Sequence, residues 1–156
     1  SIIFITVFVK QKRVAHIPNV KITQGPDNNI DVLVTRAQIK NEIAPVVIEE
    51  FLLRTRLASS EEGLRLVEFE DSSLLARYGF REGDIVREVD GHKIDTVKGA
   101  IELCESLESE LLGAKDAKQI KIALKRDDKE MNMNFTVPEF IPEKVAYTLR
   151  LEKRGR

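Results

Sequence analysis

The side chains that most often do chemistry in proteins are few in this chain and form no known catalytic pattern. His16 and His92 are the only imidazoles, and His92 lies in a polar turn. The sequence has no Gly-x-Ser-x-Gly elbow, no HExxH motif and no glycine-rich phosphate loop. Because catalysis needs a nucleophile with a base, paired acids or a metal set, we expect no catalytic residue and no enzyme activity.

The single cysteine and a group of glutamates have plain structural explanations. Cys104 falls in the apolar stripe of a predicted helix, where a thiol usually packs as a small hydrophobic side chain. Glu61, Glu62, Glu68 and Glu70 lie along a predicted strand, where alternation places them on a solvated face at least as often as in a site. No Cys/His cluster has metal-ligand spacing, so we expect neither a metal nor another cofactor.

The composition describes an ordinary soluble globular chain. Apolar residues make up 42% of the 156 residues, and 25 basic side chains oppose 26 acidic ones. Since this balance gives no field that would attract a polyanion, nucleic acid is disfavoured as a partner. The length suits one core with a smaller appendage. The apolar run over 1–9 is too short to span a bilayer.

The stretch over 79–91, GFREGDIVREVDG, is the segment around which the others are best arranged. Gly79 and Gly83 allow the backbone to turn with positive φ. The apolar residues over 85–89 predict a strand, and Asp90-Gly91 predicts a tight hairpin turn after it. We therefore expect a turn, a strand and a second turn.

The chain before this stretch predicts a small β-rich unit over 1–34, with strands at 2–9, 14–17, 20–23 and 30–34. Thr35 and Gln38 fit a capping box, so a helix should begin at about Arg36. Pro45 should end that helix near Ile43 and be the first residue of a second helix over 46–53. A helical connector and a first strand thus occupy 35–58.

The remaining segments alternate between strand and helix. A half-buried strand is expected over 64–69, then a short helix capped by Asp71 or Ser72, and a long helix capped by Asp95 or Thr96. Strands over 119–125 and 130–137 form a hairpin, and residues 139–156 add a strand and a basic tail. The tail strand could pair with the N-terminal unit or with a second chain.

The segment over 79–91 resembles the central strand of a PDZ domain, in which Gly, an apolar residue, Gly-Asp, an Ile/Val-rich strand and Asn/Asp-Gly recur. The resemblance implies an α+β fold: a PDZ-like, partly open β-barrel or sheet with two helices over 59–138. The small β-rich unit and the helical connector would precede it.

PDZ folds bind an extended polypeptide by adding it to a sheet edge beside a helix. The resemblance implies a protein or peptide partner held in such a groove. The sheet edge would be formed by Gly63, Leu64, Arg65 and Leu66, and the helix wall by Val97, Ile101 and Cys104. Glu61 and Glu62 beside this edge oppose the capture of a terminal carboxylate.

The order of segments over 34–137 resembles a narrower family, the general secretion pathway protein C family of type II secretion systems. The shared features are Val34-Thr35-Arg36-Ala37-Gln38-Ile39, the two-part helix and Gly63-Leu64-Arg65-Leu66. The resemblance implies a non-enzymatic scaffold on the periplasmic side of the bacterial inner membrane. A membrane anchor would lie upstream, and the partners would be a secreted substrate, the secretin or another secretion component.

Two other protein classes share the PDZ features. One is the PDZ regulatory module of a periplasmic or membrane protease, whose catalytic domain would lie outside this sequence. The other is a free-standing adaptor that forms a homodimer through its terminal strands.

Overall fold

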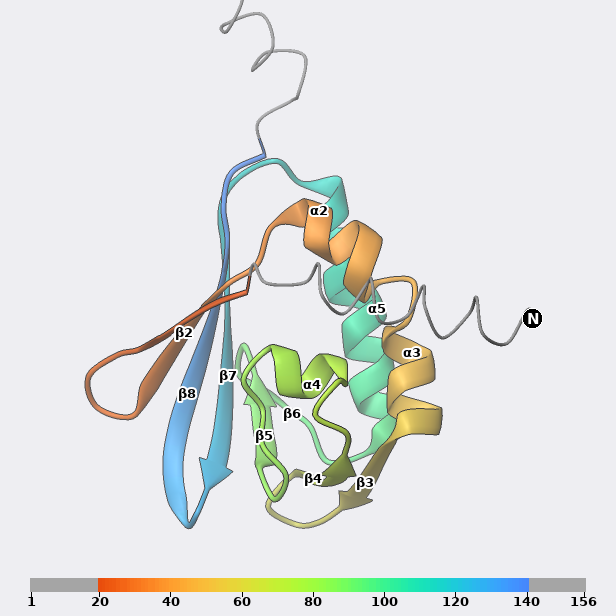
Figure 1. The fold of residues 1–156 in the computed structure, drawn as a ribbon, viewed down its shortest axis with the longest axis vertical. Helices are drawn as coiled ribbons and strands as arrows, with labels where there is room; N and C mark the ends of the chain where they lie inside the picture. Colours follow the sequence, from red (N-terminus) through yellow and green to blue (C-terminus); the bar gives the residue numbers. More distant parts are fainter. Residues whose placement is uncertain (1–19, 141–156) are drawn as a thin grey trace, which may run out of the picture.

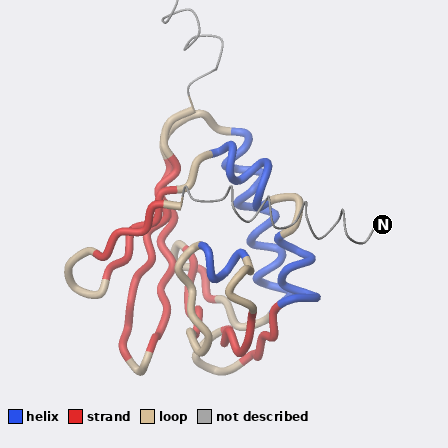
Figure 2. Tube along the Cα trace, in the orientation of Figure 1, coloured by secondary structure: helices blue, strands red, loops and turns tan. Residues whose placement is uncertain are grey.

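The computed structural model describes residues 20–140. In this part of the chain the fold is α+β, with one mixed eight-stranded sheet in the order β1-β2-β8-β7-β5-β4-β3 and β6 paired to β5. The sheet is open, and the helices gather on one side of it (Figures 1 and 2). The predicted α+β class with a partly open sheet is confirmed. The predicted strands over 2–9 and 14–17 and in the tail lie outside the described residues.

The described residues form eight strands and six helical segments. The strands are β1 (Lys21–Gln24), β2 (Asn29–Leu33), β3 (Thr55–Ser59), β4 (Leu64–Phe69), β5 (Ile85–Val89), β6 (His92–Lys93), β7 (Lys118–Arg126) and β8 (Lys129–Val137). The helical segments are α2 (Arg36–Gln38), η1 (Ile39–Ile43), α3 (Val47–Glu49), η2 (Glu50–Arg54), α4 (Leu74–Arg77) and α5 (Val97–Gly113), of which η1 and η2 are π-helical.

The β1–β2 hairpin belongs to the same sheet as the strands over 59–138. β2 pairs in parallel with β8, from Asn29 opposite Asn132 to Leu33 opposite Thr136. Val32 is 1% exposed and lies in one apolar cluster with Met133 and Val137. The sheet therefore has no break at residue 34, and the small hairpin buries its apolar face by extending the larger sheet.

Three local predictions about helix ends have different outcomes. The capping box is present, because the Thr35 side chain accepts from the Gln38 N–H while the Gln38 side chain accepts from the Thr35 N–H. Pro45 is not the first residue of the second helix, since Val46, with φ −127°, is the N-cap of α3. The cap of α4 is Ser73, not Asp71 or Ser72, because the Ser73 hydroxyl accepts from the Ala76 N–H at 3.3 Å.

The turns around β5 match the prediction. Gly79 has φ +96° directly after α4, and Gly83 has φ +91° before β5. Asp90 and Gly91 both have positive φ, and β5 pairs antiparallel with β6 across them. These are the backbone angles of a tight hairpin that follows the twist of its strands. The long helix α5 starts after Thr96, one of its two predicted caps.

Candidate functional site

The sheet ends at β3, which pairs only with β4 within residues 20–140. Ser60 and Gly63 exchange two backbone hydrogen bonds, at 2.9 and 3.2 Å, at the end of this hairpin. Because hydrogen-bonded and non-hydrogen-bonded pairs alternate along an antiparallel ladder, the N–H and C=O groups of Leu57 and Ser59 point to the open side. β3 therefore presents free backbone donors and acceptors.

The prediction that Gly63, Leu64, Arg65 and Leu66 form the open edge is wrong. β4 lies between β3 and β5, and pairs with both. The Leu66 N–H donates to the Asp84 carbonyl at 2.8 Å, and the Leu66 carbonyl accepts from the Gly83 N–H at 2.6 Å. The backbone of this segment is thus already paired. In the 55–69 hairpin the first strand is the outer one.

Two side chains of β4 lie on the inner face of the sheet, next to the open edge of β3. Leu64 and Leu66 are 4% and 3% exposed, and they lie directly opposite Ser59 and Leu57 on the inner face. Arg65 is exposed, and Gly63 lies in the turn against β5. Leu64 and Leu66 therefore form the floor, while β3 offers the edge.

The helix α5 packs beside β3, the outer strand of the hairpin, and not beside an open edge at 63–66 as predicted. Leu57 packs in one apolar cluster with Leu64, Val97, Ala100 and Leu103, which joins β3 to the first turns of α5. Cys104 packs against the main core. Ile101 is half-buried. The sequence did not predict a role for Leu57, because it is the only large apolar residue of β3. Leu103 was also not among the predicted wall residues.

An apolar cavity of about 250 Å³ lies between the sheet, α5 and the connector helices. Ile43, Val47 and Phe51 line it from the connector, and Leu57 lines it from β3. Cys104, Leu107 and Glu108 line it from α5. Among the described residues that line it, Glu108 is the only charged one. A cavity of this size can accept apolar side chains from a strand bound at the β3 edge.

Burial keeps the two weak acids at the cavity in their neutral forms. Desolvation raises the pKa of the Cys104 thiol to about 11, and the carboxylates of Glu108 and Glu105 add to the rise. Desolvation also raises the pKa of Tyr78 to about 12, with a further contribution from Glu42. A thiol with a raised pKa is a poor nucleophile at neutral pH, because the thiolate is the reactive form.

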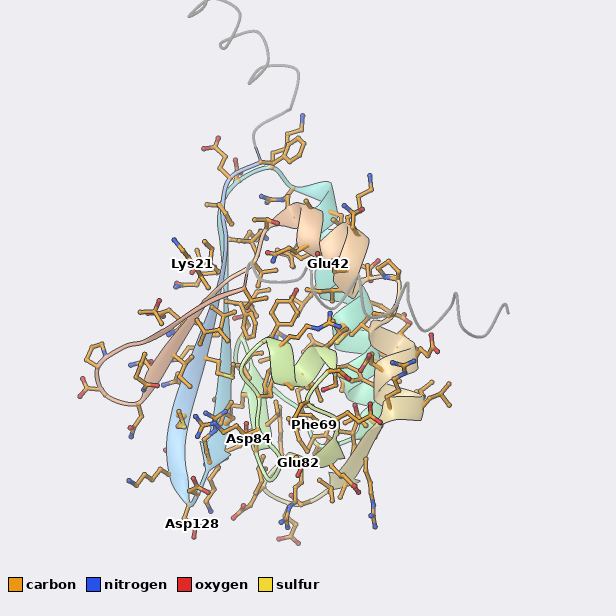
Figure 3. All side chains as sticks on the ribbon, in the orientation of Figure 1. Lys21, Glu42, Phe69, Glu82, Asp84 and Asp128 are labelled. Atoms are coloured by element: carbon orange, nitrogen blue, oxygen red, sulfur yellow. The ribbon has the colours of Figure 1, made fainter. Side chains whose placement is uncertain are left out.

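A buried ion pair holds the loop that supports β4. The Arg126 guanidinium donates two hydrogen bonds to the Asp84 carboxylate, at 2.9 and 2.8 Å, and a third to the Gly79 carbonyl. Asp84 also accepts from the Arg81 N–H at 2.8 Å. Asp84 is 1% exposed. Two residues earlier, the Glu82 side chain accepts from the Phe69 N–H at 3.2 Å (Figure 3 labels these three residues).

A second buried arginine fixes the connector to the far end of α5. Arg36 is 8% exposed and donates to the carbonyls of Leu111, Pro138 and Asp116 at 2.9, 2.6 and 2.5 Å. These carbonyls belong to the end of α5, the end of β8 and the loop between α5 and β7. The connector helices are thus held in place as one wall of the cavity.

Other kinds of site have no support in residues 20–140. No group of three or more His, Cys, Asp or Glu side chains in this range is arranged to hold a metal ion. No helix in the same range has both the length and the apolar character needed to cross a bilayer.

Comparisons with known proteins give structural similarity only. No protein-family model matches the chain, and no curated protein matches it. The PDZ domain of HtrA3 bound to a phage-derived ligand is 16% identical, with a TM-score of 0.33, and the match covers 52% of this chain and 78% of that domain.

Two further solved structures are similar to this chain. The PDZ domain of EpsC from Vibrio cholerae is 14% identical, with a TM-score of 0.35, and the match covers 65% of this chain and 98% of that domain. The HtrA-type protease AlgW with a decapeptide is 15% identical, with a TM-score of 0.34 and 69% of this chain covered. The match spans 36% of that protease.

Proposed function

We propose that this chain is a non-enzymatic, protein-binding scaffold, in which the β3 edge receives an extended polypeptide segment beside α5. One observation carries this proposal: a strand edge with no partner strand among residues 20–140 lies directly over an apolar cavity and next to a long helix. The backbone groups of Leu57 and Ser59 supply hydrogen bonds that do not depend on sequence. The cavity supplies selection among side chains.

The bound segment would act as an added strand. Its backbone would pair with Leu57 and Ser59, and alternate side chains would point toward the floor formed by Leu64 and Leu66. Its other side chains would remain in solvent. Because α5 stands beside the edge, the segment would also contact the helix, whose residues Val97 and Leu103 pack with Leu57; a role for Ile101 as a wall residue remains a prediction.

We also propose the cellular setting that the sequence resemblance implies. The chain would act on the periplasmic side of the bacterial inner membrane, as a type II secretion component that engages a secreted substrate or another secretion protein. The motif Val34–Ile39 supports this setting, and Arg36 within it holds the connector beside α5. The genomic test is whether the coding region begins with a membrane helix and lies beside secretin and secretion-ATPase genes. If the coding region has no membrane helix and no such neighbouring genes, the proposed secretion role is refuted.

The binding mode is tested with peptides selected from a random phage-displayed library. Ser59→Pro removes one outward N–H from β3 without breaking a hydrogen bond to β4, and edge strands tolerate proline. We expect a loss of affinity of about tenfold, the scale of one or two hydrogen bonds. Gln24→Pro is the matched control, since the same alternation points its N–H outward from β1. No selected binder, or equal loss in both variants, would refute the proposed function.

A further inference from the structure

We propose that the cavity between the sheet and the helices binds a small uncharged hydrocarbon molecule, about the size of a benzene ring with a short alkyl chain. This inference goes beyond the proposed function, because it concerns the interior of the fold and needs no polypeptide at the β3 edge. It is carried by three features of the described residues: the place of the cavity among the apolar clusters, its apolar surface and its volume.

The cavity lies where three apolar clusters border one another. The buried apolar residues of the described chain form three clusters and not one continuous core. Each cluster contributes buried side chains to the cavity lining, among them Leu111 from the first, Leu64 from the second and Leu75 from the third. Phe51 and Ile120, which also line the cavity, each pack against two of the clusters. Because a domain normally has one contiguous core, the cavity occupies the place where the three clusters would otherwise join.

The surface of the cavity is almost wholly apolar, so it offers almost no hydrogen bonds to an occupant. Even Glu108 lines it with the carbon atoms of its side chain. A buried water molecule needs about two to four polar partners, and the N–H and C=O groups of a polypeptide backbone need partners as well. Burial of an unpaired charge costs still more. The cavity therefore excludes water, a polypeptide backbone and ionised groups, and it accepts an occupant without polar groups.

The volume of the cavity, about 250 Å³, sets the size of this occupant. An engineered cavity of about 150 Å³ that is lined by Leu, Ile and Phe side chains stays dry and binds benzene. The larger cavity therefore has space for a benzene ring and for several further carbon atoms. An empty cavity deprives its lining of dispersion contacts, and it lowers stability in proportion to its volume. A hydrocarbon guest would restore those contacts.

The β3 groove and the hydrocarbon site share part of their lining. Leu57 of β3 and Leu64 of β4 line the cavity, whereas Ser59 does not. The apolar side chains of a peptide at β3 would therefore enter the space that the hydrocarbon fills, while the backbone of that peptide would pair outside it. A hydrocarbon guest should thus compete with peptide side chains, and its own binding should not depend on the backbone groups of β3.

The test titrates the full chain with n-butylbenzene and follows the methyl resonances of leucine, valine and isoleucine by NMR. The matched probe is 4-phenylbutylammonium, which has the same ring and alkyl chain and adds a cation at the end of the chain. We expect n-butylbenzene to shift the resonances of Leu107 and Val47, which line the cavity, and not those of the exposed Leu33. The cation should bind at least about tenfold more weakly, because the cavity gives its charge no partner.

Two variants fill the cavity from opposite sides, Ala100→Leu from α5 and Ala44→Leu from the connector. Each should weaken n-butylbenzene binding at least about tenfold. Ala37→Leu, at an exposed helical position of the connector, is the matched control and should change the Kd less than about twofold. Ser59→Pro should also leave this Kd unchanged, which separates failure of the β3 edge from failure of the hydrocarbon site. No binding of n-butylbenzene by the full chain, equal affinity for the cation, or unchanged affinity in both folded filling variants would overturn the inference.

Discussion

The two edges of the sheet offer the same backbone groups but differ in what lies behind them. At β3 the outward amides belong to Leu57 and Ser59, and the Leu57 side chain reaches an apolar cavity and α5. At β1 all four residues are exposed, and Ile22 is 45% exposed. An open edge is therefore only half of a binding site. The other half is a wall and a floor that can select side chains.

The largest expected effect comes from removing the support under the β3 edge. Asp84→Ala leaves the buried Arg126 without its carboxylate, and loss of one partner of a buried pair costs about 3–5 kcal/mol of unfolding free energy. Urea unfolding measures the loss. Arg56→Ala, in the exposed pair with Glu68, should cost less than about 1 kcal/mol. Similar costs for the two variants would contradict the role given to Asp84.

A smaller effect is expected from the turn that places β3 beside β4. Gly63 has φ +148°, and a Cβ there would lie 2.2 Å from the Val86 carbonyl oxygen. Gly63→Ala should therefore cost about 2 kcal/mol and speed amide exchange in β3 but not in β1. Gly83→Ala is the control, because it also has positive φ but no atom within 4 Å of the added carbon. An equal increase in amide exchange at β3 and β1 in Gly63→Ala would contradict a specific role of Gly63 in placing β3.

A further effect, on reactivity, concerns the thiol behind the β3 edge. Because the pKa of Cys104 is raised to about 11 from 9.0, alkylation at pH 8 should be about a hundredfold slower in the folded than in the unfolded chain. The folded state also holds this proton more tightly, so the stability it contributes is fully present below about pH 9 and is lost as the pH rises toward 11.

A peptide bound at β3 should slow alkylation of Cys104 further, whereas a ligand at β1 should not. The measurement is mass spectrometry after timed treatment with iodoacetamide, with and without urea. A folded-state rate equal to the unfolded rate would show that the thiol is not shielded behind the edge.

Local features of the site were predictable from the sequence. The Thr35–Gln38 capping box and the Asp90-Gly91 turn depend on residues within four positions of one another, so their chemistry is visible in the chain. The apolar stripe of α5 is also local, with Val97 and Cys104 at helical spacing. Leu64 and Leu66 were correctly expected to alternate with exposed neighbours.

The identity of the open edge was not predictable in this way. β3 has the pattern Thr-Arg-Leu-Ala-Ser, with one large apolar residue, whereas β4 has a stronger alternation, and the PDZ resemblance implies an edge at 63–66. Which strand of a hairpin lies outside depends on its pairing with a third strand, here β5, which is distant in sequence. The parallel pairing of β2 with β8, about a hundred residues apart, is equally invisible to local patterns.

Amide hydrogen exchange with a selected peptide bound tests the central claim most directly. The account predicts that the peptide slows exchange at Leu57 and Ser59 and leaves Ile22 and Gln24 unchanged, because only the β3 edge has a floor and a wall. Protection at β1, or at neither edge with the peptide saturating, would contradict it.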